Sequence, residues 1–107
     1  MDLGLTGRVA IVTGGSDGIG KAAARSLARE GARVAICARR PDVLEAAAEE
    51  LRADTGGDVV GIVCDMTEDS QVQQLVADVV ERWGQLDILV NNAGTSSAMP
   101  VEVLTEE

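Results

Sequence analysis

The sequence predicts an α/β fold built on a doubly wound parallel sheet. Three observations support this prediction: short apolar segments alternate with longer segments of helical periodicity, the loops between them are short, and the apolar side chains are mostly small or branched, with Trp83 as the one aromatic residue. Such alternation implies parallel strands joined by right-handed crossovers, and buried parallel strands favour branched side chains. A chain of 107 residues has room for one domain at most, and we expect residues 1–107 to form a single, partial domain.

The first strand and helix flank a glycine-rich turn. A strand is expected over residues 8–13, which contain the apolar run Val-Ala-Ile-Val, and a helix over residues 21–30, which Gly31 ends. The apolar face of this helix comprises Ala22, Ala23, Leu27 and Ala28.

The second unit repeats this pattern. We expect a strand over residues 33–38 and a helix over residues 42–54, which Pro41 precedes at a first-turn position and Gly56 stops. A third strand is expected over residues 59–64. The apolar face of the second helix comprises Leu44, Ala47, Ala48 and Leu51.

The third unit completes the predicted sheet. Ser70 is the expected N-cap of a third helix, Gly84 ends it, and residues 86–90 form a fourth strand. We expect the strand order 3-2-1-4, which begins a Rossmann-like, dinucleotide-binding fold. The helical periodicity is carried by Val72, Leu75, Val76, Val79 and Val80.

The last residues have the pattern of a helix start, because Thr105 is followed by two glutamates. Two residues cannot form a helix. We therefore expect the sequence to be truncated at the start of a fourth helix, before a fifth strand, so that the strand over residues 86–90 lies at the sheet edge. A natural flexible tail is the alternative interpretation.

The charge balance argues against two classes of partner. Eighteen acidic and nine basic residues give a net charge of −9, which repels nucleic acid and anionic lipid. The start of the chain lacks the pattern of a secretory signal, and no run of 18 apolar residues occurs. We expect a cytoplasmic protein that binds neither nucleic acid nor membranes.

The two cysteines, Cys37 and Cys64, form no Cys-x-x-C pair, and the sequence contains no histidine. Metal binding and dithiol redox chemistry are therefore poorly supported. Buried reduced thiols are the favoured interpretation, although both cysteines fall near the ends of neighbouring strands, where an adventitious disulfide is the alternative.

The sequence from Thr13 to Gly20, Thr-Gly-Gly-Ser-Asp-Gly-Ile-Gly, follows the first strand and leads into the first helix. Glycines there allow a tight turn and let a pyrophosphate approach amide groups at the positive end of a helix. An ordinary turn is the alternative, because a glycine-rich segment alone is a weak signal.

The spacing Thr-Gly-x-x-x-Gly-x-Gly, together with Asn-Asn-Ala-Gly at residues 91–94, resembles the short-chain dehydrogenase/reductase family, and the resemblance covers essentially the whole chain. It implies that the glycine turn wraps the pyrophosphate and the adenosine ribose. The residues implied in this role are Gly14, Ser16, Gly18, Ile19 and Gly20.

Arg39 and Arg40 stand at the expected end of the second strand, about 20 residues beyond the last glycine. At this position a carboxylate accepts from the ribose 2′-hydroxyl, whereas arginine accommodates a 2′-phosphate. No acid lies within residues 33–41, so the sequence favours NADP(H) over NAD(H). A solvated basic pair is the alternative, and Asp17 stands where NADP-preferring relatives often carry a basic residue.

The resemblance implies further contacts beyond the third and fourth strands. Asp65 would accept from the adenine amino group, and Met66 would offer backbone contacts beside it. The alternative for Asp65 is a loop carboxylate bonded to local amides. The residues implied beside the nicotinamide ribose are Asn92, Ala93 and Gly94, with turn formation as the alternative.

No catalytic residue can be assigned. The family resemblance implies hydride transfer between nicotinamide and a carbonyl or alcohol, with a serine and a Tyr-x-x-x-Lys pair acting on the substrate. The sequence has no tyrosine, and its only lysine, Lys21, lies in the first predicted helix. We therefore expect the cofactor-binding half of an oxidoreductase that is homo-oligomeric when complete and inactive as these 107 residues alone. The alternative is a non-catalytic nucleotide-binding or interaction module that is complete at this length.

Overall fold

The computed structural model describes residues 4–14, 18–65, 67–91 and 102–105. Strands and helices alternate along the chain until the last two elements, which are both strands. The order is β1 (Val9–Thr13), α1 (Gly18–Arg29), β2 (Arg33–Ala38), α2 (Pro41–Thr55), β3 (Val59–Val63), α3 (Asp69–Trp83), β4 (Ile88–Asn91) and β5 (Glu102–Thr105).

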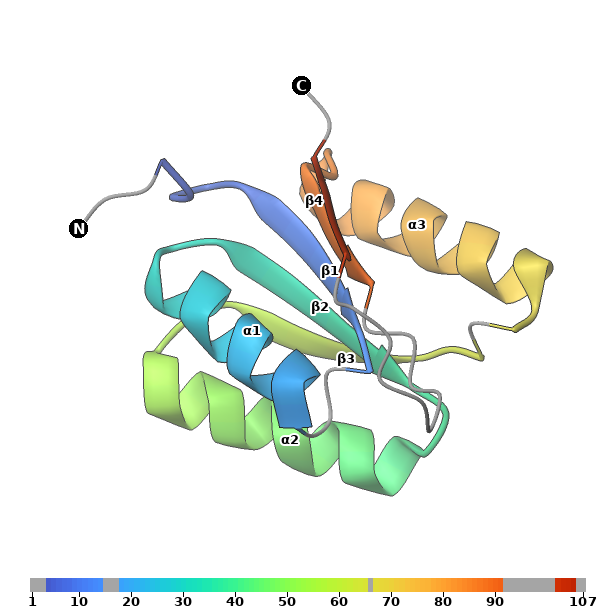
Figure 1. Ribbon diagram of the computed structural model, residues 1–107, viewed down its shortest axis with the longest axis horizontal. Helices are drawn as coiled ribbons and strands as arrows, with labels where there is room; N and C mark the ends of the chain where they lie inside the picture. The colour runs from blue at the N-terminus through green and yellow to red at the C-terminus, as the bar shows by residue number, and fades with distance from the viewer. Residues whose placement is uncertain (1–3, 15–17, 66, 92–101, 106–107) are drawn as a thin grey trace.

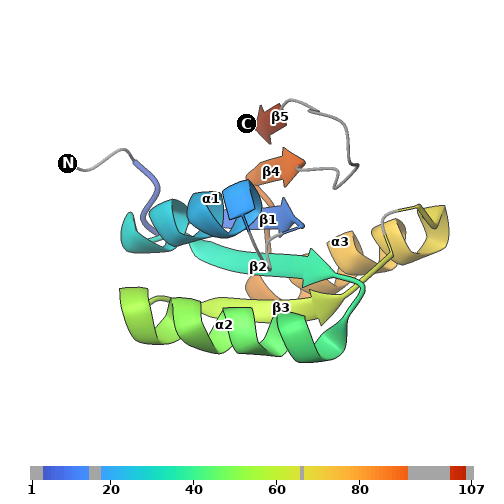
Figure 2. The ribbon, with the colours of Figure 1, turned by 60° about the horizontal axis from the view of Figure 1, so that its bottom comes forward.

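The strands form one sheet in the order β3-β2-β1-β4-β5. Strands β1 to β4 pair in parallel, which confirms the predicted order 3-2-1-4 and the Rossmann-like arrangement. The fifth strand runs the opposite way (Figure 2), so that Thr105 lies opposite Ile88. The prediction that β4 forms the sheet edge is therefore wrong. Thr105, the predicted cap of a fourth helix, is the last residue of β5, and the two glutamates after it lie outside the described residues. The segment Glu-Val-Leu-Thr contains two β-branched residues, which favours a strand.

Helices cover both faces of the sheet. Helices α1 and α2 lie together on one face, and α3 lies on the other (Figure 1). Side chains of β1 alternate between the two cores: Ala10 and Val12 pack on the side of α1 and α2, whereas Val9 and Ile11 pack on the side of α3. This burial on both faces explains the continuous apolar run of β1.

Two helix starts differ from the prediction. Helix α1 begins at Gly18, three residues earlier than expected, so the last part of the glycine motif is helical. Helix α3 has Glu68 at its N-cap, without a side-chain cap bond, and Ser70 lies in its first turn. The ends of α2 and α3 agree with the prediction, because Gly56 and Gly84 are their C-caps.

Strand β4 begins at Ile88 rather than at residue 86. Just before it, the carboxylate of Asp87 accepts the hydrogen bond from the Val9 N–H that a strand carbonyl would otherwise accept. The Asp87 backbone N–H donates to the Val9 carbonyl at 2.9 Å, and the Asp87 Oδ2 accepts from the Val9 N–H at 2.8 Å. The Val9 hydrogen bond is the main cause that holds the pKa of Asp87 below its ordinary value. Asp87 thus extends the pairing of β1 with β4 by one residue.

Within the described ranges, no helix has the length and apolar character needed to cross a membrane.

Candidate functional site

The predicted binding residues follow the carboxyl ends of parallel strands, which meet at one edge of the sheet (Figure 2). Gly14 follows β1, Arg39 and Arg40 follow β2, and Asp65 lies two residues beyond β3. Parallel α/β sheets bind ligands at this edge. Ser16, Met66, Asn92, Ala93 and Gly94 were also predicted as site residues and lie outside the described residues.

Two glycines of the predicted phosphate-binding turn, Gly14 and Gly18, lie among the described residues. Gly14 and Gly18 have φ angles of 66° and 58°, in the left-handed region where a Cβ is disfavoured. The Gly14 N–H donates to the Cys37 carbonyl at 2.9 Å, which ties the turn to β2. Gly18 opens α1, Ile19 exposes 65% of its surface, and Gly20 is buried. The first N–H groups of α1 therefore face the same edge as a positive helix end.

The two arginines after β2 have different surroundings. The Arg40 Nη2 atom lies 3.6 Å from Asp42 Oδ2, and both side chains are about three-quarters exposed. An ion pair so exposed contributes little to stability. The positive charge of Arg39 helps to lower the pKa of Asp65, so the residue after β2 and the residue beyond β3 lie close enough to interact.

Asp65 sits in a tightly bonded turn between β3 and α3. Its Oδ1 atom accepts from the Thr67 N–H at 2.9 Å and from the Thr67 hydroxyl at 2.6 Å. The Asp65 N–H donates to Gln71 Oε1 at 2.8 Å. The pKa of Asp65 is lowered by the Thr67 hydroxyl, then by the Thr67 N–H, and then by the charge of Arg39. Asp65 is therefore a carboxylate that only accepts hydrogen bonds.

Sequence reasoning identified Asp65 but missed the two residues that hold it, Thr67 and Gln71. The spacing Asp-x-Thr is a signal for Thr67, because an aspartate often accepts from the residue two positions later. Gln71 lies in the first turn of α3, and no local pattern identifies its bond to the backbone of Asp65. Both residues lie at the same sheet edge as the other candidate residues.

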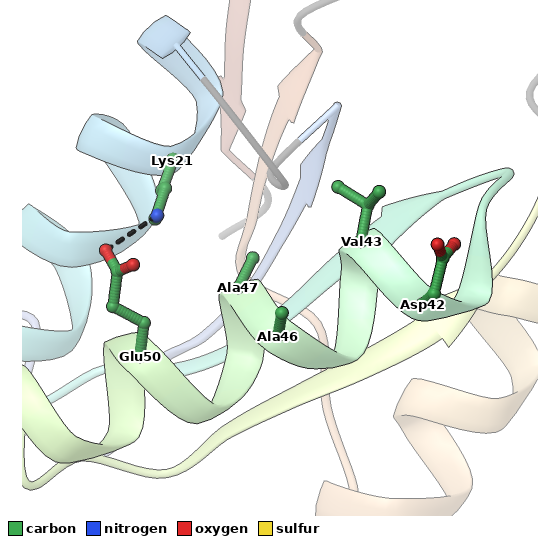
Figure 3. A pocket seen from close by; sticks show the side chains of 6 residues that line it. All are labelled: Lys21, Asp42, Val43, Ala46, Ala47 and Glu50. Carbon is green, nitrogen blue, oxygen red and sulfur yellow. Dashed lines mark ion pairs between the residues drawn. The ribbon is translucent and has the colours of Figure 1, made fainter.

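A shallow groove of about 370 Å³ separates α1 from α2 (Figure 3). The Lys21 Nζ atom forms an ion pair with Glu50 Oε2 at 2.6 Å across it. The only lysine of the sequence is thus engaged in joining two helices. The groove is lined by Lys21, Asp42, Val43, Ala46, Ala47 and Glu50.

Further ion pairs continue along the same two helices. Arg25 lies 3.2 Å from Glu50 and 2.7 Å from Asp54, and Arg29 lies 3.2 Å from Asp54. The cations, Lys21 included, are four residues apart on α1, and their acidic partners are four residues apart on α2, so each set lies on one helix face. This ladder fixes α1, and with it the helix start at the sheet edge, against α2.

Both cysteines are buried, as the sequence predicts. Burial, and after it the neighbouring Cys64, raise the pKa of the Cys37 thiol to about 12. Burial also raises the pKa of Cys64. Among the described residues, no group of three or more side chains is arranged to hold a metal ion.

Comparisons with known proteins agree with this geometry. Residues 8–107 match the family model described as short chain dehydrogenase. The sorbitol dehydrogenase of Cereibacter sphaeroides is 40% identical over 96% of this chain, which spans 39% of that protein. The structure of L-sorbose reductase from Gluconobacter frateurii, complexed with NADPH and L-sorbose, superposes with a TM-score of 0.85 and 42% identity, over 94% of this chain and 38% of that one.

A second solved structure, the RhlG/NADP active-site complex of Pseudomonas aeruginosa, has a TM-score of 0.78 and 46% identity, over 86% of this chain and 36% of that one. The chain thus spans less than two fifths of the length of these three proteins. The match to the family model extends over nearly all of the sequence and includes every element of the sheet. The chain belongs to the short chain dehydrogenase family.

Proposed function

We propose that this chain is the NADP(H)-binding part of an oxidoreductase that acts on a carbonyl or alcohol substrate. The observation that carries the proposal is that the glycine turn, Arg39 and Asp65 converge at the carboxyl edge of the parallel sheet. NADP(H), when bound, supplies or takes up the hydride. The proposed contact residues are Gly14, Ser16, Gly18, Ile19, Gly20, Arg39, Arg40, Asp65, Met66, Asn92, Ala93 and Gly94.

The described residues fit a dinucleotide in three respects. The left-handed backbone at Gly14 and Gly18 suits a tight turn before α1, whose first helical N–H groups would bind a pyrophosphate. Ile19 offers an exposed apolar surface in the first turn of α1. Asp65 offers an ionised acceptor for the adenine amino group.

The preference for NADP(H) rests on Arg39. It follows β2, and among the described residues it takes part in no ion pair, whereas Arg40 pairs with Asp42. Its guanidinium is therefore available to a 2′-phosphate. The NADPH and NADP complexes among the similar structures support this choice.

The chemistry of proton transfer is assigned to no residue of this chain. Lys21 is paired with Glu50 of α2 across the groove between the two helices, and the sequence contains no tyrosine. We propose that the complete protein is a cytoplasmic homo-oligomer that reduces or oxidises its substrate. The alternative, a non-catalytic nucleotide-binding module, is favoured by one observation: β5 closes the edge of β4 at which a further strand was expected.

The test is a calorimetric titration of the complete natural polypeptide with NADPH and with NADH. A charge-assisted contact contributes about 1.5–3 kcal/mol. The dissociation constant of NADPH should therefore be lower than that of NADH by about tenfold or more. Arg39→Asp should reverse the preference. Arg33→Asp is the matched control, because it changes the charge equally at the opposite end of β2. Equal affinity for both cofactors, unchanged by Arg39→Asp, would contradict the proposal.

A further inference from the structure

We propose that Thr67 and Gln71 are positioning residues that hold the Asp65 carboxylate in the orientation that selects an adenine amino group. This inference rests on the function proposed above and assigns specificity within that site. Neither residue was among the predicted site residues. Both act through Asp65 rather than by touching the dinucleotide.

The first support is the pair of hydrogen bonds from Thr67. Its backbone N–H and its hydroxyl both donate to Oδ1 of Asp65, at 2.9 and 2.6 Å. Two donors from one residue restrict the rotation of the carboxylate about its own bonds. Among the residues that the structure describes, none donates to Oδ2. That oxygen therefore remains as the acceptor for a ligand.

The second support is the way in which the Asp65 backbone is held. The Cys64 N–H donates to the Ala38 carbonyl at 3.0 Å, which attaches the turn to β2. On the other side, the Asp65 N–H donates to Gln71 Oε1 at 2.8 Å, and the Asp65 carbonyl accepts from the Glu68 N–H at 3.0 Å. Asp65 is thus fixed between the sheet and the first turn of α3. Gln71 supplies the one side-chain contact to its main chain among these bonds.

The chemistry of the held group explains the selectivity. An ionised carboxylate only accepts hydrogen bonds, so the group facing it must be a donor. The 6-amino group of adenine donates, whereas the 6-oxygen of hypoxanthine accepts. A site that presents a fixed acceptor discriminates strongly against a ligand that lacks the donor. A carboxylate free to rotate can turn away from the mismatched oxygen, and much of the discrimination is then lost.

The experiment measures binding of NADPH and of its hypoxanthine analogue, reduced nicotinamide hypoxanthine dinucleotide phosphate, to the complete natural polypeptide. The readout is the ratio of the two dissociation constants, which a loss of general stability does not change. The native protein should favour adenine by about tenfold. Thr67→Val removes the hydroxyl donor and keeps the shape, and Gln71→Leu removes the acceptor for the Asp65 N–H. Each should lower the ratio by about threefold or more.

Matched variants separate positioning from mere occupancy of space. Thr67→Ser retains the hydroxyl and Gln71→Glu retains an acceptor oxygen, so both should keep the ratio within about twofold of native. The positioning role is refuted if Thr67→Val and Gln71→Leu leave the ratio unchanged, which includes the case in which they weaken the binding of both dinucleotides equally. If Asp65→Asn abolishes the preference in the same experiment, the adenine role of Asp65 stands. If Asp65→Asn also leaves the ratio unchanged, the adenine contact in the proposed function fails as well.

Discussion

Replacing Asp87 by alanine should lower the free energy of unfolding by about 2 kcal/mol, although the side chain lies outside the main core. Asp87 Oδ2 accepts from the Val9 N–H at 2.8 Å, and Val9 is fully buried. Alanine leaves that donor without a partner away from water, which costs about 1–3 kcal/mol. The Arg8 side chain lies 3.5 Å from Asp87 Oδ1 and is half exposed, so the loss of that ion pair adds little.

Urea unfolding of the complete natural polypeptide, followed by circular dichroism, measures this effect. Asp58→Ala is the matched control, because the Asp58 carboxylate is 58% exposed and lies 4.0 Å from Arg33. Its loss should cost less than about 0.5 kcal/mol. Asp87→Asn keeps an acceptor oxygen and should fall between the two. If Asp87→Ala destabilises no more than Asp58→Ala, the side-chain extension of the β1–β4 pairing contributes nothing.

The same contact predicts the sign of a pH effect. The pKa of Asp87 is held below its ordinary value, chiefly by the Val9 N–H. The ionised carboxylate therefore contributes its full stabilisation above the ordinary pKa of about 3.9 and loses it as the pH falls through the lower, folded value. The stability difference between the native protein and Asp87→Asn should be constant near neutrality and shrink in acid. A difference that grows on acidification would refute the assignment.

Three further predictions follow from the packing and from the residues present. Asp54→Ala removes the partner of two arginines on α1 and should cost up to about 1 kcal/mol at low salt and less at 1 M salt, as paired urea titrations would measure; a loss independent of salt would argue against an ionic contribution. Cys37 and Cys64 should resist iodoacetamide in the folded protein, because burial raises both thiol pKa values, and should react on unfolding; rapid alkylation in native buffer, detected by mass spectrometry, would contradict their burial. The 107 residues alone should oxidise no NADPH in the presence of a carbonyl substrate, and activity above background in a pure preparation that Gly18→Trp abolishes would contradict this.

The central part of the fold could be predicted from the sequence because local and long-range signals agree there. Continuous apolar strands such as residues 9–13 are typical of parallel sheets covered on both faces, and the structure buries all five residues. Gly56 and Gly84 end their helices as expected. The position of Arg39 and Asp65 at one edge follows from the parallel order alone, since each comes after the end of a strand.

The differences arise where a local signal competes with tertiary pairing. Thr105 followed by two acids has the pattern of a helix start, but antiparallel pairing with β4 places it in a strand. Ser70 is a good N-cap residue, yet α3 begins before it and takes Glu68 at the cap. Gly18 has low helix propensity, which delayed the predicted start of α1. The contact of Asp87 with Val9 joins residues 78 positions apart, and no periodicity reports such a bond.

The distribution of charge at the sheet edge reconciles an anionic ligand with an acidic chain. The net charge of −9 repels a dinucleotide at long range, but salt screens that repulsion beyond about 8–10 Å. Within that distance the proposed contacts are the positive end of α1 and the guanidinium of Arg39. In the described part of the chain, six of the nine basic residues are engaged in ion pairs that involve none of the proposed contact residues, namely Arg8, Lys21, Arg25, Arg29, Arg33 and Arg52. The proposed recognition of phosphate at this edge therefore depends on few groups, which is why a single substitution at Arg39 is expected to change the choice of cofactor.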